Sequence, residues 1–258
     1  MVKGSYDRLL MLASIRAVGL FMGCCLVFFV PIPNAASWPY LIAATITHYV
    51  YYTFMLAGYR VGDFSQVYPI ARGVAPLVVA CLGAFMIGER LDADQLLAVS
   101  LVSVGIISLA LSPGAINALA VLFAFGTGLT IAGYTFLSGI GVRQAGTVLG
   151  YAAWLEIMTG TGEVLTASIR RRSSIGAFLE SKWKQGVTAG VLSVGAYIIV
   201  LWAMVHLPLA SVAALRETSV IFAALIGALA FREPFGLRRV VASCCVAVGI
   251  VILAFSAQ

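Results

Sequence analysis

Charged residues are scarce in this sequence: they make up 10% of its 258 residues, against about 25% in a typical soluble domain. Hydrophobic residues reach 62%, and the mean hydropathy is +1.04. This composition excludes a water-soluble enzyme, a nucleic-acid-binding protein and a disordered chain. At about 20 residues per membrane-spanning helix, the chain has room for eight to ten spans and for no separate soluble domain. We therefore predict an all-α, polytopic membrane bundle.

Motifs for catalysis, metals and cofactors are also missing. The five cysteines lie inside apolar runs and form no CxxC pair, which favours small packing residues over a disulfide framework. The sequence has no HExxH, GxSxG or Walker A motif and no phosphate-binding glycine loop. We therefore predict no catalytic residue, no metal and no cofactor, and an ATP-driven pump would need a motor from another subunit.

Nine apolar runs, separated by turn or charge signals, divide the chain. Continuous apolar runs favour spanning helices, because lipid offers no hydrogen-bond partner to the backbone of a lone strand. We expect spans at residues 9–30, 36–58, 64–87, 95–111, 118–138, 147–168, 185–205, 209–230 and 239–256.

Basic residues between these spans set the expected orientation. About eleven lie on the side of the N-terminus, and only Arg90 and Arg143 lie on the other side. Cytoplasmic loops carry an excess of Lys and Arg, so we predict a cytoplasmic N-terminus in the cell (inner) membrane and, with nine spans, an outward C-terminus. The same excess explains the formal net charge of +6 without a nucleic-acid partner. The eleven are Lys3, Arg8, Arg60, Arg170, Arg171, Arg172, Lys182, Lys184, Arg232, Arg238 and Arg239.

The chain also repeats itself at an offset of 144 residues, which places residues 72–110 on residues 216–254 without a gap. An odd number of spans separates the two copies, so they run through the bilayer in opposite directions. We predict two inverted-topology repeats, residues 1–114 with four spans and residues 115–258 with five. Such repeats are typical of secondary transporters, which bind their substrate near the midplane between the repeats. The aligned pairs include Arg72 with Arg216, Glu89 with Glu233 and Gly105 with Gly249.

Two segments carry a family resemblance. The first is AGYRVGDFSQVYPIAR, residues 57–72, followed by Gly88-Glu89-Arg90-Leu91; the second is Leu215-Arg216-Glu217-Thr218-Ser219, followed by Glu233-Pro234. With them the chain resembles, over essentially its whole length, the EamA-type branch of the drug/metabolite transporter (DMT) superfamily. The resemblance implies a helical carrier and does not specify the solute, because the family includes exporters of amino acids, metabolites and drugs.

The chain departs from the family pattern in two ways. Family members are similar to a pair of five-helix units, whereas the first unit here has four spans. The opening residues 3–8 resemble the segment that follows the family's first helix, so that helix is expected to be missing. Ten-span relatives keep both termini in the cytoplasm, whereas the charge count places this C-terminus outside, and we follow the charge count.

Six ionisable residues lie well inside the predicted spans. Even on the lenient insertion scale, a charge at a helix centre costs about 2.5–3.5 kcal/mol. Each of them must therefore face a polar cavity or pair with another charge. The six are Arg16, Arg72, Arg216, Glu156, Glu163 and Glu217.

Arg72 and Arg216 are the predicted walls of a substrate site. They lie about seven or eight residues into their spans from opposite sides, which at about 1.5 Å per residue is roughly 10–12 Å into a core about 30 Å thick. Guanidinium groups bind carboxylates and phosphates through two parallel hydrogen bonds. We expect an anionic or zwitterionic small organic solute; structural ion pairs are the alternative.

Glu156, the deepest acidic side chain, is the candidate for proton coupling, because a low dielectric disfavours the ionised form of a carboxylate. A permanent ion pair with Arg16 or Arg216 is the alternative. We expect Arg16 and Glu217 to form supporting ion pairs, since Glu217 points about 100° away from Arg216 around the helix.

Aromatic side chains can complete the site. Four tyrosines fall deep enough to line a cavity with a polar tip and a flat face, and ordinary packing is the alternative. We interpret His48 and His206 as core or interface histidines. The spacing of Gly186 and Gly190 allows close helix approach and is weak evidence for a homodimer. The tyrosines are Tyr52, Tyr68, Tyr134 and Tyr197.

Together these features predict a secondary carrier that moves a small organic metabolite or drug outward by alternating access, with a proton or another solute in counter-transport. Two alternatives stay open: an intramembrane enzyme that uses Glu156, His48 or His206, and a membrane protein that transports nothing. Movement of a solute across the bilayer would distinguish the carrier from both.

Overall fold

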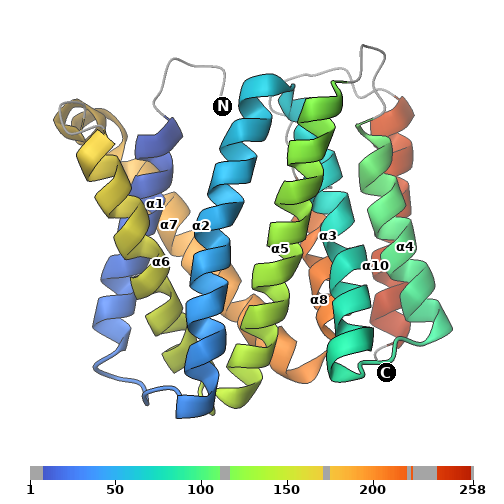
Figure 1. Ribbon diagram of the computed structural model, residues 1–258, viewed down its shortest axis with the longest axis horizontal. Coiled ribbons are helices and arrows are strands. Elements are labelled where there is room, and N and C mark those ends of the chain that lie inside the picture. The colour runs from blue at the N-terminus through green and yellow to red at the C-terminus, as the bar shows by residue number, and fades with distance from the viewer. Residues whose placement is uncertain (1–7, 111–116, 171–174, 220–221, 223–236, 257–258) are drawn as a thin grey trace. The chain divides into compact units, whose positions relative to one another are not determined.

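The structure, a computed structural model, describes residues 8–110, 117–170, 175–219, 222 and 237–256. This part of the chain forms nine α-helices, one short 3-10 helix and no strand (Figure 1), which confirms the predicted all-α bundle. The elements are α1 (Arg8–Leu26), η1 (Ala35–Ser37), α2 (Trp38–Val61), α3 (Phe64–Ile87), α4 (Ala93–Ser108), α5 (Ala118–Gln144), α6 (Val148–Arg170), α7 (Ile175–His206), α8 (Leu209–Arg216) and α10 (Leu237–Ser256).

Several of these helices have the dimensions of membrane spans. Four described segments are long and apolar enough to cross a bilayer: Leu9–Leu26, Gln66–Ile87, Ala118–Gln144 and Lys182–His206. Large apolar side chains also cover the outside, with Phe85 89% and Phe28 84% exposed. Exposed apolar side chains of this kind are favourable in contact with lipid and unfavourable in contact with water. Together with the four apolar segments, they make the chain an integral membrane protein.

Two helices are longer than the apolar runs predicted. Helix α5 continues beyond residue 138 to Gln144 and stops before Gly146, whose φ of 69° breaks the helix. Helix α7 begins at Ile175 rather than near residue 185. Its first turns carry charged residues, yet they are anchored by Phe178, which is buried in a small core with residues of α1 and α6. Hydropathy alone misses such an amphipathic extension.

Some sequence predictions lie outside the described residues. The span expected at 209–230 begins as α8, but residues 220–221 and 223–236 are not described. The segment that aligns with α3 in the predicted repeat is therefore covered only in part. Lys3, Arg171, Arg172, Arg232, Glu233 and Pro234 also lie outside the described residues.

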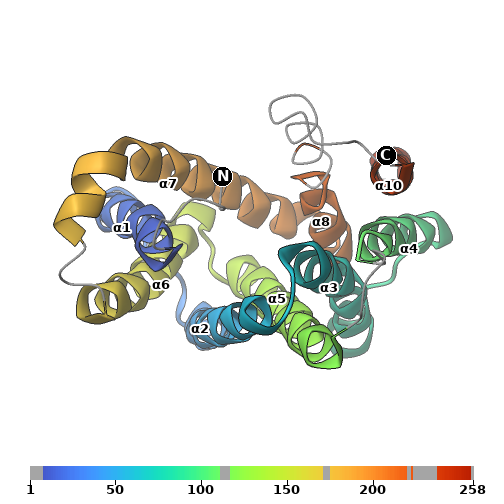
Figure 2. The ribbon, with the colours of Figure 1, turned by 90° about the horizontal axis from the view of Figure 1, so that it is seen from above.

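The chain forms two compact units. The first consists of residues 1–45 and 140–205 and contains α1, α6 and nearly all of α7, which lie side by side in Figures 1 and 2. Glycines bring these helices together: a Cβ on Gly160 would lie 2.9 Å from the carbonyl oxygen of Arg16, and a Cβ on Gly190 would lie 2.6 Å from Cβ of Val18. Gly186 likewise packs on Ser14. The glycines considered as evidence for a homodimer thus pack against α1 of the same chain.

The second unit consists of residues 46–139 and 206–258, and it includes α3, α4, α8 and α10. Helices α4 and α10 pack together and run in opposite directions (Figure 1). A Cβ on Gly105 would lie 3.3 Å from the carbonyl oxygen of Ala242, and a Cβ on Gly249 would lie 2.8 Å from that of Ala98. Each contact becomes the other when 144 is added to or subtracted from its residue numbers. The packing is therefore reciprocal.

Candidate functional site

Arg72 on α3 and Glu217 at the end of α8 form a close ion pair. Arg72 Nε donates to Glu217 Oε2 at 2.9 Å, and Arg72 Nη2 donates to Ser219 Oγ at 3.2 Å. The guanidinium carbon also lies 5.9 Å from the ring centroid of Tyr68, within the range of a cation–π interaction. Arg72 thus has a carboxylate, a hydroxyl and an aromatic face around it.

Helix α8 is anchored at both ends, which fixes this pair. At its beginning, Glu89 Oε2 accepts a hydrogen bond from the backbone N–H of Leu209 at 3.0 Å, where the helix dipole favours negative charge. At its end, Glu217 accepts from Arg72 Nε on α3, and its own N–H donates to the carbonyl oxygen of Ala214 at 3.0 Å, a tightened last turn. Because Glu89 follows α3 and Arg72 lies within α3, both anchors tie α8 to the same neighbouring helix.

Arg216, the residue before Glu217, also belongs to this group. Its Nη1 donates to Oγ1 of Thr135 on α5 at 3.3 Å, and it interacts electrostatically with Glu217 together with Arg72. The structure therefore brings Arg72, Arg216 and Glu217 into one cluster, which we call the α8 cluster. Two guanidiniums beside one carboxylate make a local environment that favours an added negative charge.

An aromatic group of four side chains lies in the same unit, contributed by α2 and α5. The rings of His48 and Tyr134 stack with centroids 4.0 Å apart, and those of Tyr51 and Tyr52 lie 4.9 Å apart. Tyr51 and Tyr134 are also close enough to Arg72 to interact with it electrostatically. Of the predicted tyrosines, the structure brings Tyr52, Tyr68 and Tyr134 into the unit that holds the α8 cluster.

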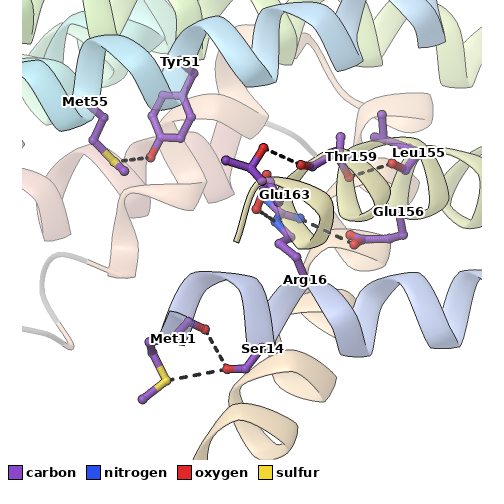
Figure 3. A network of polar contacts seen from close by, with 11 residues as sticks. Met11, Ser14, Arg16, Tyr51, Met55, Leu155, Glu156, Thr159 and Glu163 are labelled. Atoms are coloured by element: carbon purple, nitrogen blue, oxygen red, sulfur yellow. Dashed lines mark hydrogen bonds and ion pairs between the residues drawn. The ribbon is translucent and has the colours of Figure 1, made fainter. Parts of the chain in front are cut away.

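A second ionic cluster lies in the first unit, between α1 and α6 (Figure 3). Arg16 places Nη1 3.5 Å from Glu156 Oε2 and Nε 3.3 Å from Glu163 Oε2. The three side chains are 19%, 7% and 12% exposed, respectively, so all are largely withdrawn from solvent. We call this group the α6 cluster. Tyr197, the fourth predicted tyrosine, belongs to this unit as a half-buried residue of α7.

A glycine makes room for the α6 cluster. A Cβ on Gly19 would collide with Oε2 of Glu156, so the carboxylate of Glu156 lies directly against the backbone of α1. A larger residue at position 19 would require the carboxylate of Glu156 to move away from α1.

Some participants were not singled out from the sequence as members of these sites. Glu163 was predicted as one of the six ionisable residues inside the spans but was assigned to no site. It is the second carboxylate on Arg16, and its spacing of seven residues from Glu156 places both on one helix face. His48 and Tyr51 join the aromatic group, and their spacing of three residues is likewise that of one helix face. Thr135 and Ser219 had no such signal, because hydroxyl partners depend on which helices meet.

The chemistry that these groups offer is ionic and aromatic recognition. Among the described residues, no group of three or more His, Cys, Asp or Glu side chains is arranged to hold a metal ion. The α8 cluster supplies guanidinium donors beside aromatic faces, and such donors suit the carboxylate or phosphate of a small molecule.

Comparison with known proteins places the chain in a family. The profile of the EamA-like transporter family matches residues 118–255, more than half of the sequence. A solved structure titled "Crystal structure of protein" has a TM-score of 0.77 and 17% sequence identity, and the match covers 98% of this chain and 89% of that one. That likeness concerns the fold alone, and no curated protein matches. The chain belongs to the EamA-like transporter family, and hence to the drug/metabolite transporter superfamily.

Proposed function

We propose that this chain is a secondary carrier that moves a small organic solute with a carboxylate, anionic or zwitterionic, out of the cell across the inner membrane. The family makes it a membrane transporter; the solute class, the direction and the mechanism are our proposal. Arg72 and Arg216 bind the negative group of the solute, and Glu217 holds Arg72 in place. Tyr68, Tyr52 and Tyr134 provide the aromatic contacts, and Tyr197 stays a predicted contact.

The observation that carries this proposal is the unequal burial of the Arg72–Glu217 pair. The side chain of Glu217 is 4% exposed, whereas that of Arg72 is 18% exposed. The guanidinium is therefore the part of the pair that a solute can reach. Arg72 has five N–H donors, and its contacts with Glu217 and Ser219 use two of them. A carboxylate can take the remaining donors without displacing Glu217.

The aromatic group suits the rest of such a solute. Ring faces bind apolar groups by stacking and bind ammonium groups by cation–π attraction. A zwitterion, whose amine lies close to its carboxylate, would use Arg72 for one charge and the ring of Tyr134 or Tyr52 for the other. A simple cation would meet two arginines and be repelled.

The packing of α4 on α10 supports alternating access by two inverted repeats, residues 1–114 and 115–258. A reciprocal contact between helices of opposite direction is what a two-fold relation between the repeats requires. Two similar halves of opposite orientation can exchange conformations and so open a site to each side in turn. The excess of basic residues on the N-terminal side supports a cytoplasmic N-terminus.

Metabolite release and counterflow test this proposal in sequence. Cells that lack the gene and cells that overexpress it would be compared for the solutes they release, measured by mass spectrometry of the medium. Overexpression is expected to increase the release of solutes that carry a carboxylate. Purified protein in liposomes would then be assayed for counterflow of leucine, isocaproate and isopentylamine, which share the five-carbon isopentyl unit and differ in charged groups, together with the solutes identified in the medium.

Arg72→Gln should abolish the counterflow of carboxylate-bearing solutes, and Arg216→Gln should reduce it. Arg60→Gln is the matched control, because Arg60 is an exposed arginine near the end of α2 in the same unit. Counterflow of isopentylamine alone, unchanged in Arg72→Gln, would overturn the assignment of the solute class.

A further inference from the structure

We propose that Glu156 is a proton-binding site and that Arg16 shares its charge between Glu156 and Glu163 according to whether that proton is bound. The site belongs to the first unit and uses none of the residues of the α8 cluster. Proton binding at this site does not depend on the proposed function. Only its role, which is to couple the proton to solute movement, rests on that function.

The geometry of the α6 cluster is that of a shared guanidinium. A firm charge-assisted hydrogen bond between N–H and a carboxylate measures about 2.7–2.9 Å, as the Arg72–Glu217 pair does at 2.9 Å. The contacts of Arg16 measure 3.5 Å to Glu156 and 3.3 Å to Glu163. Neither contact of Arg16 is therefore a short hydrogen bond, and a small movement of the guanidinium can shorten either one.

The contact with Gly19 and the longer distance to Arg16 make Glu156, rather than Glu163, the carboxylate that takes the proton, since the carboxylate oxygens of Glu163 are buried as well. The side chain of Glu156 is 7% exposed, lies against the backbone of Gly19, and has the long contact with Arg16 as its ionic partner. Removing a carboxylate from water without a close cation disfavours its ionised form. Glu163 lies closer to Arg16, at 3.3 Å, and its side chain is 12% exposed.

The other neighbouring helix segments of the unit bring few ionisable groups to this place. From α1 the facing charge is Arg16. From α7 the residue that approaches Gly19 beside Glu156 is Val194; Tyr197 follows it by one turn, whereas Glu180, Lys182 and Lys184 precede it by about 15–20 Å of helix at about 1.5 Å per residue. The part of α2 in this unit meets α6 through Trp38 and Trp154, with ring centroids 5.1 Å apart, and its ionisable residue is Tyr40.

The binding step is a simple protonation. A proton from water adds to the carboxylate of Glu156 and gives a neutral carboxylic acid. The ionic contact of Glu156 with Arg16 is lost, Arg16 keeps its charge and commits to Glu163, and the net charge of the cluster rises by one. Release of the proton reverses each change.

Infrared difference spectroscopy tests the site directly. The full-length protein in liposomes would be titrated with acid in the absence of any solute, and the carbonyl stretch of a protonated carboxylic acid would be recorded. We expect a carboxylic acid band that titrates in the wild type and is lost in Glu156→Gln. Glu217→Gln, in the other unit, should keep this band.

Glu163→Gln gives the sharper result. Without Glu163, Arg16 is committed to Glu156 and favours its ionised form, so the midpoint of the band should move to lower pH by about 1 unit or more. A merely structural ion pair would leave no titrating band in the wild type for this variant to move. Rescue by Glu156→Asp should restore a titrating band.

Three outcomes would overturn the proposal. The first is a wild type with no band that depends on Glu156. The second is a midpoint that does not move, or moves to higher pH, in Glu163→Gln. The third is loss of the band when sodium is added at constant pH, which would make the ligand a metal cation. Because no solute is present, failure here leaves the carrier proposal standing, and failure of counterflow leaves the proton site standing.

Discussion

The two ionic clusters are built from the same residue types and differ in how closely they pair. In the α8 cluster, Arg72 holds one carboxylate at 2.9 Å and a hydroxyl at 3.2 Å. In the α6 cluster, Arg16 stands 3.3 Å and 3.5 Å from two carboxylates. The first arrangement is a firm pair whose guanidinium keeps donors for a solute. The second is a cation shared by two carboxylates, and protonation of one carboxylate moves the ionic contact of Arg16 to the other.

The difference follows from how each cluster is supported. Helix α8 is anchored to α3 and its following loop at both ends, by Glu89 and by Glu217. The α6 cluster lies between α1 and α6, which approach closely at glycines. Hydrogen-bonded anchors fix a side chain in one geometry. Apolar helix packing does not, so a long side chain such as Arg16 can move between two acceptors at similar distances. The predictions below test this contrast.

The largest effect is expected from breaking the firm pair. Arg72→Gln leaves the buried carboxylate of Glu217 without its closest cation and should cost about 3–5 kcal/mol of unfolding free energy, in addition to abolishing counterflow. The double variant Arg72→Gln/Glu217→Gln should recover most of that stability, since neither charge is then left alone. Unfolding by denaturant in detergent measures both, with Arg60→Gln as the control. Equal losses in the single and double variants would argue against a direct pair.

Substitutions in the α6 cluster are expected to change transport more than they change stability. Glu156→Gln mimics the protonated carboxyl, so solute accumulation driven by a pH gradient should disappear while counterflow without a gradient continues. Uptake into liposomes with and without an imposed gradient separates the two. The matched change Glu163→Gln should keep gradient-driven accumulation and shift its pH dependence. Unaltered gradient dependence in Glu156→Gln would remove Glu156 from the coupling.

Removing an anchor of α8 should loosen the firm pair. Glu89→Ala deletes the charged acceptor of the Leu209 N–H and should destabilise the protein by about 1.5–3 kcal/mol. It should also weaken counterflow, because α8 carries Arg216 and is followed by Glu217. Glu180→Gln, an exposed carboxylate on α7, should change stability by no more than about 0.5 kcal/mol. A wild-type counterflow rate in Glu89→Ala would mean that the pair needs no such anchor.

Crowding the α6 cluster should have a smaller effect. Gly19→Ala places a methyl group against Oε2 of Glu156 and should cost about 1–3 kcal/mol while altering the infrared titration. Gly195→Ala is the control in the same unit, because a Cβ there would meet nothing within 4 Å, and it should stabilise α7 by about 0.5–1 kcal/mol. Equal stability and equal infrared titration of the two variants would argue against the close contact between Glu156 and α1.

The smallest effect is expected at the partner of Arg216. Thr135→Val removes the hydroxyl that accepts from Arg216 Nη1 and should cost about 0.5–1.5 kcal/mol, with a modest rise in the solute concentration needed for half-maximal counterflow. Thr127→Val is matched, since Thr127 is equally buried on α5 but bonds to the carbonyl of Phe123 on its own helix. Identical transport by the two variants would separate Arg216 from Thr135 in function.

Much of the fold could be predicted from the sequence. The apolar runs gave helices close to their observed bounds, as with α3 at Phe64–Ile87, because lipid forces each apolar run of sufficient length to satisfy its backbone within itself. The prediction was wrong at the ends where a helix is amphipathic or passes through glycine. Helix α7 begins earlier because Phe178 packs on α1 and α6, and this contact is not visible in the local sequence.

The candidate site could be predicted only as a set of residues. The cost of burying a charge identified six residues that must face a polar cavity or pair with another charge, namely Arg16, Arg72, Arg216, Glu156, Glu163 and Glu217. It could not assign partners, since Arg72 and Glu217 are separated by 145 positions and Arg16 and Glu156 by 140. The hydroxyl of Ser219 and the stacking of His48 on Tyr134 depend on the same assignments.

The sequence by itself therefore determined that the chain is an all-helical membrane protein with charges that must be satisfied inside the bilayer. Those conclusions follow from composition, length and the energetic cost of exposing polar groups to lipid, which act on each segment separately. The tertiary structure alone decided that Arg72 is held tightly by one carboxylate and that Arg16 is shared by two. Pairing depends on which helix faces meet and at what distance, and helix packing sets these through contacts between residues far apart in the chain.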